Sequence, residues 1–271
     1  MPELPEVQTI VTDLRRQVSQ KRIVSCRIIR STVVHGDDRN FARRVVGGKI
    51  VEIKRRGKFI LIDLDRDRYI ITHLKMTGKF VVASKFRHYH RHDRAVLLLD
   101  NNQKIVFNDS RCFGRLEICD DITKHAGLKK LGWEPWDKRV SESTLLTDFK
   151  KRTTPIKNLL LDQSIITGIG NIYASEILFD AKINPFRKSK SLNKKEIARL
   201  IRSMRKTLHE AIECNGTSIS DYRRVDDKTG NYQNFLKVYG KAGENCVHCT
   251  TPIRKLKQQQ RSTFLCSNCQ K

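Results

Sequence analysis

The sequence predicts an α+β protein in which strands come first and helices follow. Between residues 22 and 119 the chain is a series of short β-branched and apolar runs separated by turn-forming residues, the pattern of an antiparallel sandwich or barrel. After residue 136 the apolar residues recur every three or four positions, which indicates helices. Four of the 8 cysteines lie close to the end of the chain, where their spacing is typical of a small metal-bound hairpin.

The first element is a helix predicted over residues 5–18. Val7, Ile10 and Leu14 recur at three- and four-residue steps and form one apolar face. Pro5 suits the first helical turn, and Glu6 lies at the positive end of the helix dipole. The beginning of the chain is therefore expected to be fixed to a packed helix.

The spacing of apolar residues along the chain predicts the strands and helices that follow. The expected strands are IVEIKRR, KFILIDL, YIITHLK, GKFVVAS, AVLLLD, KIVFND and RLEIC. The expected helices are SESTLLTDFKKR, TPIKNLLLD, NIYASEILFDAKI and LNKKEIARLIRSMRKTLHEAIECNG, the last one stopping at Asn215-Gly216. A polar stretch from 217 to about 235 has almost no apolar period, and it is either a functional loop or disordered.

The charge of the chain favours a polyanionic partner. Lys and Arg number 54 against 29 Asp and Glu, a net charge of +25, and such an excess favours nucleic acid. No apolar run is long enough for a transmembrane helix, and no signal peptide pattern opens the chain. A cytosolic protein without membrane contact is expected.

The most specific motif is a pair of Cys-x2-Cys knuckles at the end of the chain. Cys246, Cys249, Cys266 and Cys269 follow the pattern C-x2-C-x16-C-x2-C, which supplies the four thiolates of tetrahedral zinc. Four thiolates close the coordination shell, so this zinc is expected to be structural. His248 lies within the first knuckle as an alternative ligand.

Two further stretches suggest a phosphate-binding turn and a nucleophile. TGIGN, residues 167–171, joins two apolar helical segments and offers a tight turn for a phosphate, although a helix cap explains it equally simply. If Met1 is removed, Pro2 carries a secondary α-amine that is partly uncharged near neutral pH. Such an amine can attack an aldehyde-like carbon with Glu3 as acid or base; the alternative is that Pro2 only stiffens the start.

Taken in order, these motifs resemble the formamidopyrimidine-DNA glycosylase and endonuclease VIII family, and within it the bacterial formamidopyrimidine-DNA glycosylases. The stretches MPELPEV, RRGKFILIDL, HLKMTGKF, NDSRCFGRLEI, LLDQSIITGIGNIYASEILF, VYGKAGENCVHC and TFLCSNCQK carry the resemblance over essentially the whole chain. It implies an N-terminal β-sandwich flanked by helices (1–134), a helix–two-turn–helix domain (135–236) and a zinc-finger hairpin (237–271).

The resemblance also implies the roles of individual residues. Pro2 is the nucleophile on C1′ of the damaged nucleoside, Glu3 the acid or base, and Lys58 a lysine at the lesion phosphate. Glu6 matches a second acidic residue of the first motif. The other expected DNA contacts are Asn171 and Arg261 on phosphates, Met76, Arg111 and Phe113 in the gap left by the flipped base, and Lys157 nearby.

The implied activity is base-excision repair of oxidised purines. The enzyme is expected to act as a monomer on double-stranded DNA with 8-oxoguanine, formamidopyrimidines or abasic sites, in the cytoplasm at the nucleoid. Gln8 departs from the family's PEVET, and Ser110 and Cys112 from its DPRRFG. The alternatives are the sister enzyme for oxidised pyrimidines, whose start usually has glycine where this chain has Leu4, and a DNA-binding zinc protein without catalysis.

Overall fold

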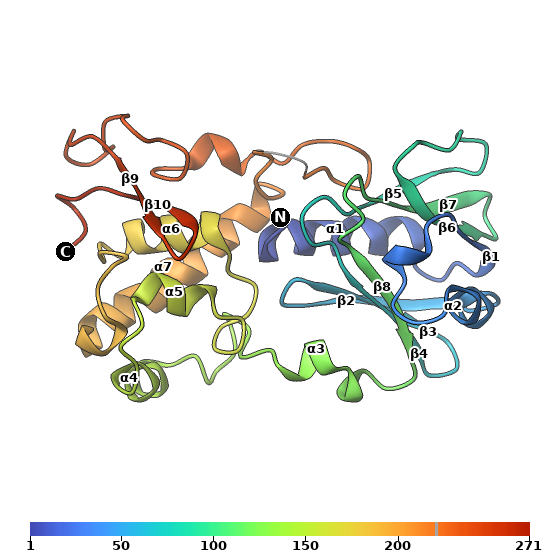
Figure 1. The fold of residues 1–271 in the computed structure, drawn as a ribbon, viewed down its shortest axis with the longest axis horizontal. Coiled ribbons are helices and arrows are strands. Elements are labelled where there is room, and N and C mark those ends of the chain that lie inside the picture. Colours follow the sequence, from blue (N-terminus) through green and yellow to red (C-terminus); the bar gives the residue numbers. More distant parts are fainter. Residues whose placement is uncertain (220–221) are drawn as a thin grey trace. The chain divides into compact units, whose positions relative to one another are not determined.

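The computed structural model describes residues 1–219 and 222–271. They form two compact units (Figure 1): Met1–Lys129 together with Cys214–Asn231, and Lys130–Glu213 together with Tyr232–Lys271. Strands dominate the first unit and helices the second, so the predicted α+β class is confirmed. Among the described residues no helix has both the length and the apolar character needed to cross a membrane.

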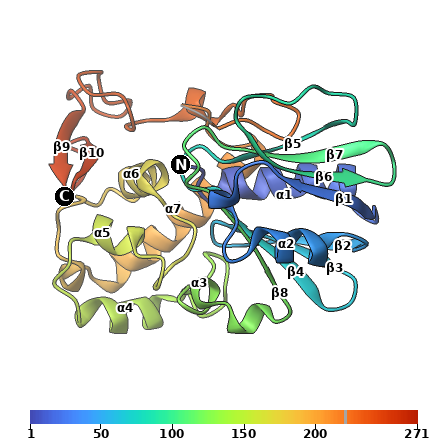
Figure 2. The same ribbon diagram turned by 45° about the vertical axis from the view of Figure 1, so that its right-hand side comes forward.

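The first unit is built on two antiparallel four-stranded sheets. One has the order β1 (Ile23–Ile28), β6 (Asp93–Leu99), β7 (Gln103–Asn108), β5 (Lys79–Ser84). The other has the order β2 (Ile50–Arg56), β3 (Phe59–Leu64), β4 (Arg68–His73), β8 (Arg115–Cys119). The two sheets form separate layers in Figure 2, and one apolar core contains side chains of both. The sequence pattern did not distinguish a sandwich from a barrel, and the structure shows a sandwich.

Two helices flank this sandwich. α1 (Leu4–Val18) packs against β2, β3 and β5, and its bounds agree with the predicted helix within one residue. α2 (Asp38–Val45) was not predicted, because only Phe41 and Val45 of this short segment are apolar enough to become buried. The short helices η1 (Ser31–Val33), η2 (Ile122–Lys124) and α3 (Ala126–Lys129) complete the unit before residue 130.

The segment 214–231 returns to the first unit from the end of a helix of the second. Tyr222 and Val225 are buried in the sandwich core. The Arg224 guanidinium donates two hydrogen bonds to Asp13 of α1, at 3.0 and 2.9 Å. The predicted polar loop therefore has an apolar and ionic anchor; its residues Ser220 and Asp221 lie outside the described part of the chain.

The second unit contains α4 (Glu142–Lys150), α5 (Ile156–Leu161), α6 (Asn171–Asp180) and α7 (Lys194–Glu213), with η3 (Ser189–Ser191) and η4 (Tyr232–Phe235). All four helices coincide with predicted ones. Asn215 and Gly216 follow α7 in left-handed conformations, with φ of 60° and 78°, as expected for a helix stop. The hairpin β9 (Arg254–Gln258) and β10 (Arg261–Leu265) ends the chain.

Candidate active site and DNA-binding residues

The N-terminus of α1 brings Pro2, Glu3 and Glu6 together. All three are buried, and the Glu3 backbone N–H donates to Glu6 Oε2 at 2.8 Å. Glu6 lies in the first turn of α1, so its carboxylate satisfies an N–H group that the helix itself leaves without a partner. The predicted nucleophile and its neighbour are thereby held on a rigid helix end.

The other oxygen of Glu6 reaches the segment 214–231. Glu6 Oε1 accepts a hydrogen bond from the Thr217 backbone N–H at 2.8 Å. Gly216 makes this approach possible, since a Cβ there would lie 2.9 Å from Glu6 Oε1 and its φ is +78°. The structure therefore shows a positioning role for Glu6, while its predicted contact with DNA stays a prediction.

Lys58 lies in the tight turn between β2 and β3. Gly57 has a φ of 57°, which turns the chain there, and Lys58 is only 6% exposed. The charge of Lys58 also affects His73, at the end of β4. The pKa of His73 is lowered to about 3, first by burial and then by the positive charges of Lys75 and Lys58. His73 is therefore a neutral imidazole, and its Nδ1 accepts a hydrogen bond from the Lys75 N–H at 3.0 Å.

Met76, Arg111 and Phe113 occupy two loops of the first unit. Met76 and Phe113 are 43% and 47% exposed, so their apolar surface is accessible to a binding partner. The Arg111 guanidinium lies 4.6 Å from the centroid of the Phe113 ring. The Met76 and Phe113 side chains therefore do not pack in the core of the first unit but project to solvent.

Asp109 joins these two loops from inside. It is fully buried; Oδ1 accepts from Thr77 Oγ1 and from the Arg111 N–H, and Oδ2 accepts from the Gly114 N–H at 2.7 Å. A buried carboxylate with several donors is strongly held in place. Sequence reasoning missed this residue, although it stands two positions before Arg111 in the quoted motif NDSRCFGRLEI.

In the second unit, three predicted residues meet at the backbone of Ser262. Its carbonyl oxygen accepts from Lys157 Nζ at 2.9 Å and from Asn171 Nδ2 at 3.0 Å. Arg261 precedes Ser262 and is exposed. The arrangement fixes the start of β10 against the N-terminal ends of α5 and α6, with the Arg261 side chain outside. Lys157 itself is 1% exposed, and its predicted contact with DNA stays a prediction.

The four cysteines of the two knuckles converge as predicted. Their Sγ atoms all lie within 4.8 Å of one another, with 3.9 Å between Cys246 and Cys269 and 3.4 Å between Cys249 and Cys266. Tetrahedral Zn–S bonds of about 2.3 Å require sulfur separations of about 3.8 Å, so the residues fit a zinc ion. The His248 ring instead stacks on Phe179, with centroids 5.3 Å apart. One structural zinc ion bound by the four thiolates is confirmed, without His248.

A second missed residue holds the chain that leads to the zinc hairpin. Glu176 of α6 is buried, and its carboxylate accepts from the backbone N–H groups of Lys237, Val238 and Tyr239 at 2.8 to 3.0 Å. The only sequence signal for a buried role of Glu176 is its position in NIYASEILF, where it is a charged residue between apolar ones. Like Asp109, it is a buried carboxylate that accepts backbone N–H groups, but those it accepts are about 60 residues away in sequence.

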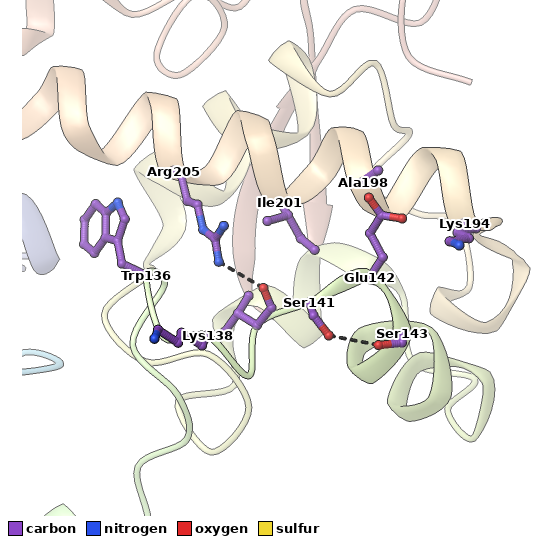
Figure 3. Close-up of a pocket in the computed structure, with 10 residues that line it drawn as sticks. Trp136, Lys138, Ser141, Glu142, Ser143, Lys194, Ala198, Ile201 and Arg205 are labelled. Atoms are coloured by element: carbon purple, nitrogen blue, oxygen red, sulfur yellow. Dashed lines mark hydrogen bonds between the residues drawn. The ribbon is translucent and has the colours of Figure 1, made fainter.

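A hollow in the second unit contains none of the predicted site residues. This cavity of about 620 Å³ lies between α7 and the segment 136–143, and Figure 3 shows Trp136 and Arg205 at one end of it. Arg205 donates to the backbone carbonyls of Pro135 and Val140, each at 3.0 Å. The guanidinium thus holds the segment before α4 in place and is not a free cation in the cavity.

Comparison with known families matches three parts of the chain. A model described as the formamidopyrimidine-DNA glycosylase N-terminal domain matches residues 1–116. The H2TH domain of formamidopyrimidine-DNA glycosylase matches residues 131–223, and a zinc finger found in FPG and IleRS matches residues 243–271. The predicted borders at 134 and 236 stay predictions.

Curated relatives and solved structures are similar over the full length. Formamidopyrimidine-DNA glycosylase of Dinoroseobacter shibae is 37% identical over 284 residues and that of Listeria monocytogenes 38% over 275, with 100% of each chain covered. A Lactococcus lactis Fpg complex with DNA containing an abasic site has a TM-score of 0.94 at 32% identity, covering 99% of both chains. A second complex of that protein, with DNA containing FAPY-dG, has a TM-score of 0.93 at 32% identity, over 99% of this chain and 100% of that one.

Proposed function

The chain belongs to the formamidopyrimidine-DNA glycosylase family, and on that premise we propose that it excises 8-oxoguanine and formamidopyrimidines from double-stranded DNA through Pro2. It is a bifunctional DNA glycosylase and AP lyase of base-excision repair with one structural zinc ion. The observation that carries the role of Pro2 is its burial beside Glu3 at an α1 end that Glu6 fixes.

The chemistry requires a free amine on Pro2. In the chain as translated this nitrogen is an amide with Met1, so removal of Met1 creates the nucleophile. The nitrogen lone pair attacks C1′, and the bond from C1′ to the base breaks with its electrons going to the base, which takes up a proton. Opening of the sugar ring then gives an iminium between Pro2 and C1′. Glu3 is the acid or base for these proton transfers.

Strand cleavage follows from the iminium. Loss of a proton from C2′ expels the 3′ phosphate, and loss of a proton from C4′ then expels the 5′ phosphate. Hydrolysis of the imine releases the sugar fragment and restores the amine. Lys58, in its turn beside the sheet, contacts the phosphate at the lesion. The zinc ion takes no part, because four thiolates leave no open coordination position.

DNA is held by contacts on both units. Asn171 and Arg261 bind phosphates with Lys58, while Met76, Arg111 and Phe113 fill the space left by the flipped nucleotide. The exposed apolar tips of Met76 and Phe113 support this role, since DNA would cover them. We propose that Lys157 acts through Ser262, by fixing the strand that carries Arg261. Glu6 likewise serves DNA binding indirectly, by fixing the end of α1.

The setting proposed for this activity is the bacterial cytoplasm, with the enzyme working as a monomer bound to the nucleoid through DNA. The net charge of +25 supports an electrostatic contribution to that binding. The DNA affinity should therefore fall steeply with salt, with a logarithmic slope of about −0.9 per phosphate contacted. An affinity that did not change with salt would contradict these phosphate contacts.

Borohydride trapping tests the proposed nucleophile. The protein is mixed with a duplex containing one 8-oxoguanine opposite cytosine, borohydride is added, and the crosslinked residue is located by mass spectrometry. An adduct on Pro2 is expected. The control is the same protein with an N-terminal extension that is not cleaved, which has no amine at Pro2 and should bind DNA without forming the adduct.

The other outcomes of this experiment separate the alternatives. An adduct with an oxidised pyrimidine but none with 8-oxoguanine would assign the specificity of the sister enzyme. No adduct with either substrate, from protein shown to begin at Pro2 and to bind DNA, would overturn the proposed chemistry. Trapping at a lysine instead of Pro2 would overturn the role of Pro2 as nucleophile but would leave the proposed imine chemistry in place.

A further inference from the structure

The outer face of the first sheet carries a hollow that none of the predicted site residues line. Its volume is about 320 Å³, within the size range of small-molecule sites. Cys26 of β1 and Leu97 of β6 pack into the core, so their neighbours Arg27 and Leu98 point to the opposite face and line the hollow. Further lining comes from Lys104 of β7 and from the loop between β5 and β6.

The charged side chains that line this hollow are all cationic. Arg27, Lys85 and Lys104 line it, and no acidic residue does. Lys104 is only 3% exposed; its Nζ donates to the backbone carbonyls of Lys85 and Arg87. In the part of the chain that the structure describes, none of the three cations forms an ion pair. Buried positive charge without a carboxylate is unfavourable, and a bound anion would neutralise it.

Two aromatic rings complete the hollow. Lys104 Nζ lies 4.9 Å and the Arg27 guanidinium carbon 5.1 Å from the centroid of the Tyr89 ring, so Tyr89 positions both cations. Phe86 is 79% exposed, the most exposed large apolar side chain of the described residues. Lys85 Nζ lies 5.0 Å from the centroid of the Phe86 ring. An exposed ring beside cations that have no carboxylate partner is the combination with which proteins hold a nucleotide, by stacking on the base and by attraction of the phosphate.

We propose that this hollow binds one nucleotide unit, with its base against Phe86 and its phosphate against Arg27 and Lys85. The unit comes either from a single DNA strand or from a free nucleotide, since the two present the same chemistry. The site lies apart from the residues proposed for glycosylase chemistry, and its occupation does not depend on Pro2. Excision on a short duplex should therefore be the same with and without a functional hollow.

The test is an NMR titration of the full, zinc-loaded chain labelled with ¹⁵N. The probes are deoxyadenosine monophosphate, a single-stranded thymidine oligonucleotide, and inorganic phosphate. The mononucleotide should shift the amides of residues 85–89 and 96–98. Phe86→Ala should weaken its affinity about tenfold, the loss expected from one stacked base, and Arg27→Gln should weaken it as well. Both side chains are exposed, so both variants should fold.

Matched exposed positions supply the controls. Phe186→Ala and Arg39→Gln remove a ring and a guanidinium elsewhere on the surface, and both should leave the titration unchanged. Shifts of the same amides by the oligonucleotide, at lower concentration than by the mononucleotide, would assign the site to a DNA strand. The reverse order would assign it to a free nucleotide. Equal binding of inorganic phosphate and mononucleotide, or no shift with any probe, would overturn the proposal.

Discussion

The loops that carry Met76 and Phe113 and the hairpin that carries Arg261 are fixed by different means. In the first unit a buried carboxylate, Asp109, gathers N–H and O–H donors from both loops. In the second unit four thiolates hold the hairpin through a metal, and Ser262 adds two hydrogen bonds. Each solution keeps a side chain for which we propose DNA contact exposed on an ordered backbone, but a carboxylate works only inside an existing core. The short zinc hairpin has little core of its own, so a metal takes that place.

Removal of zinc should break this comparison most severely. Structural zinc contributes about 10–16 kcal/mol to the folding of zinc-finger peptides, so chelation should unfold the hairpin β9–β10 and weaken DNA binding. The sandwich should remain, because no ligand comes from it. Amide hydrogen exchange, with metal loss verified by elemental analysis, measures both units at once. Intact DNA binding after complete metal loss would contradict the role of the hairpin.

Asp109→Asn should have the next largest effect, confined to the first unit. The amide N–H₂ cannot accept from Gly114 or Arg111, so a buried donor loses its partner at a cost of about 1–3 kcal/mol. The loops of Met76 and Phe113 should then exchange faster and base excision should slow, with zinc content unchanged. Asp67→Asn, in an exposed turn, is the matched control. Unchanged excision by a less stable Asp109→Asn protein would separate Asp109 from the function of these loops.

His73 should make the first unit sensitive to acid. Its pKa in the folded protein is about 3, below the ordinary value of about 6.5, so the unfolded chain takes up a proton first as the pH falls. The contribution of His73 to the free energy of unfolding is therefore complete above pH 6.5 and decreases towards pH 3. At pH 5 the loss is about 2 kcal/mol. Denaturant unfolding followed at β4 should show this slope, and His73→Asn, which keeps an acceptor for Lys75, should lack it. An equal slope in both proteins would assign the acid sensitivity to other groups.

Lys157→Met should have the smallest effect. Met replaces the buried stem, and Asn171 and the zinc ion still hold Ser262, so a loss of about 1 kcal/mol is expected. If Lys157 acts through Ser262, the salt slope of DNA binding stays the same as in the control Lys151→Met. A slope smaller by about 0.9 would show that Lys157 contacts a phosphate directly.

The sequence predicted those parts of the molecule whose causes are local. The cysteine ligands, the strand runs and the four long helices depend on spacing within a few residues, and all were found where expected. The α+β class followed from the order of those runs. Pro2 and Glu3 came from the chemistry of an N-terminal amine and from motif resemblance, and Lys58 from resemblance alone. The structure does not test the predicted roles of these three residues.

The contacts that the sequence did not reveal join residues far apart. Glu6 and Thr217, like Asp13 and Arg224, are 211 positions apart, and no periodicity reports such a pair. Asp109 and Glu176 looked like ordinary polar residues because most of their hydrogen-bond donors are backbone N–H groups, which carry no sequence signal. α2 was missed for the opposite reason, since its eight residues are too few for a helical period to stand out.

The return of residues 214–231 to the sandwich limits how this protein can be divided. A fragment that ended at residue 134 would lack Tyr222 and Val225, which belong to the sandwich core, and the Arg224 partner of Asp13. It would expose that apolar surface and should aggregate. A chimaera that exchanged N-terminal halves between relatives would combine a sandwich from one parent with a segment 214–231 from the other. Its core would be mismatched unless both segments came from the same parent. The sandwich is thus encoded by two separated segments of the chain, whereas the four zinc ligands of the hairpin lie within one continuous segment.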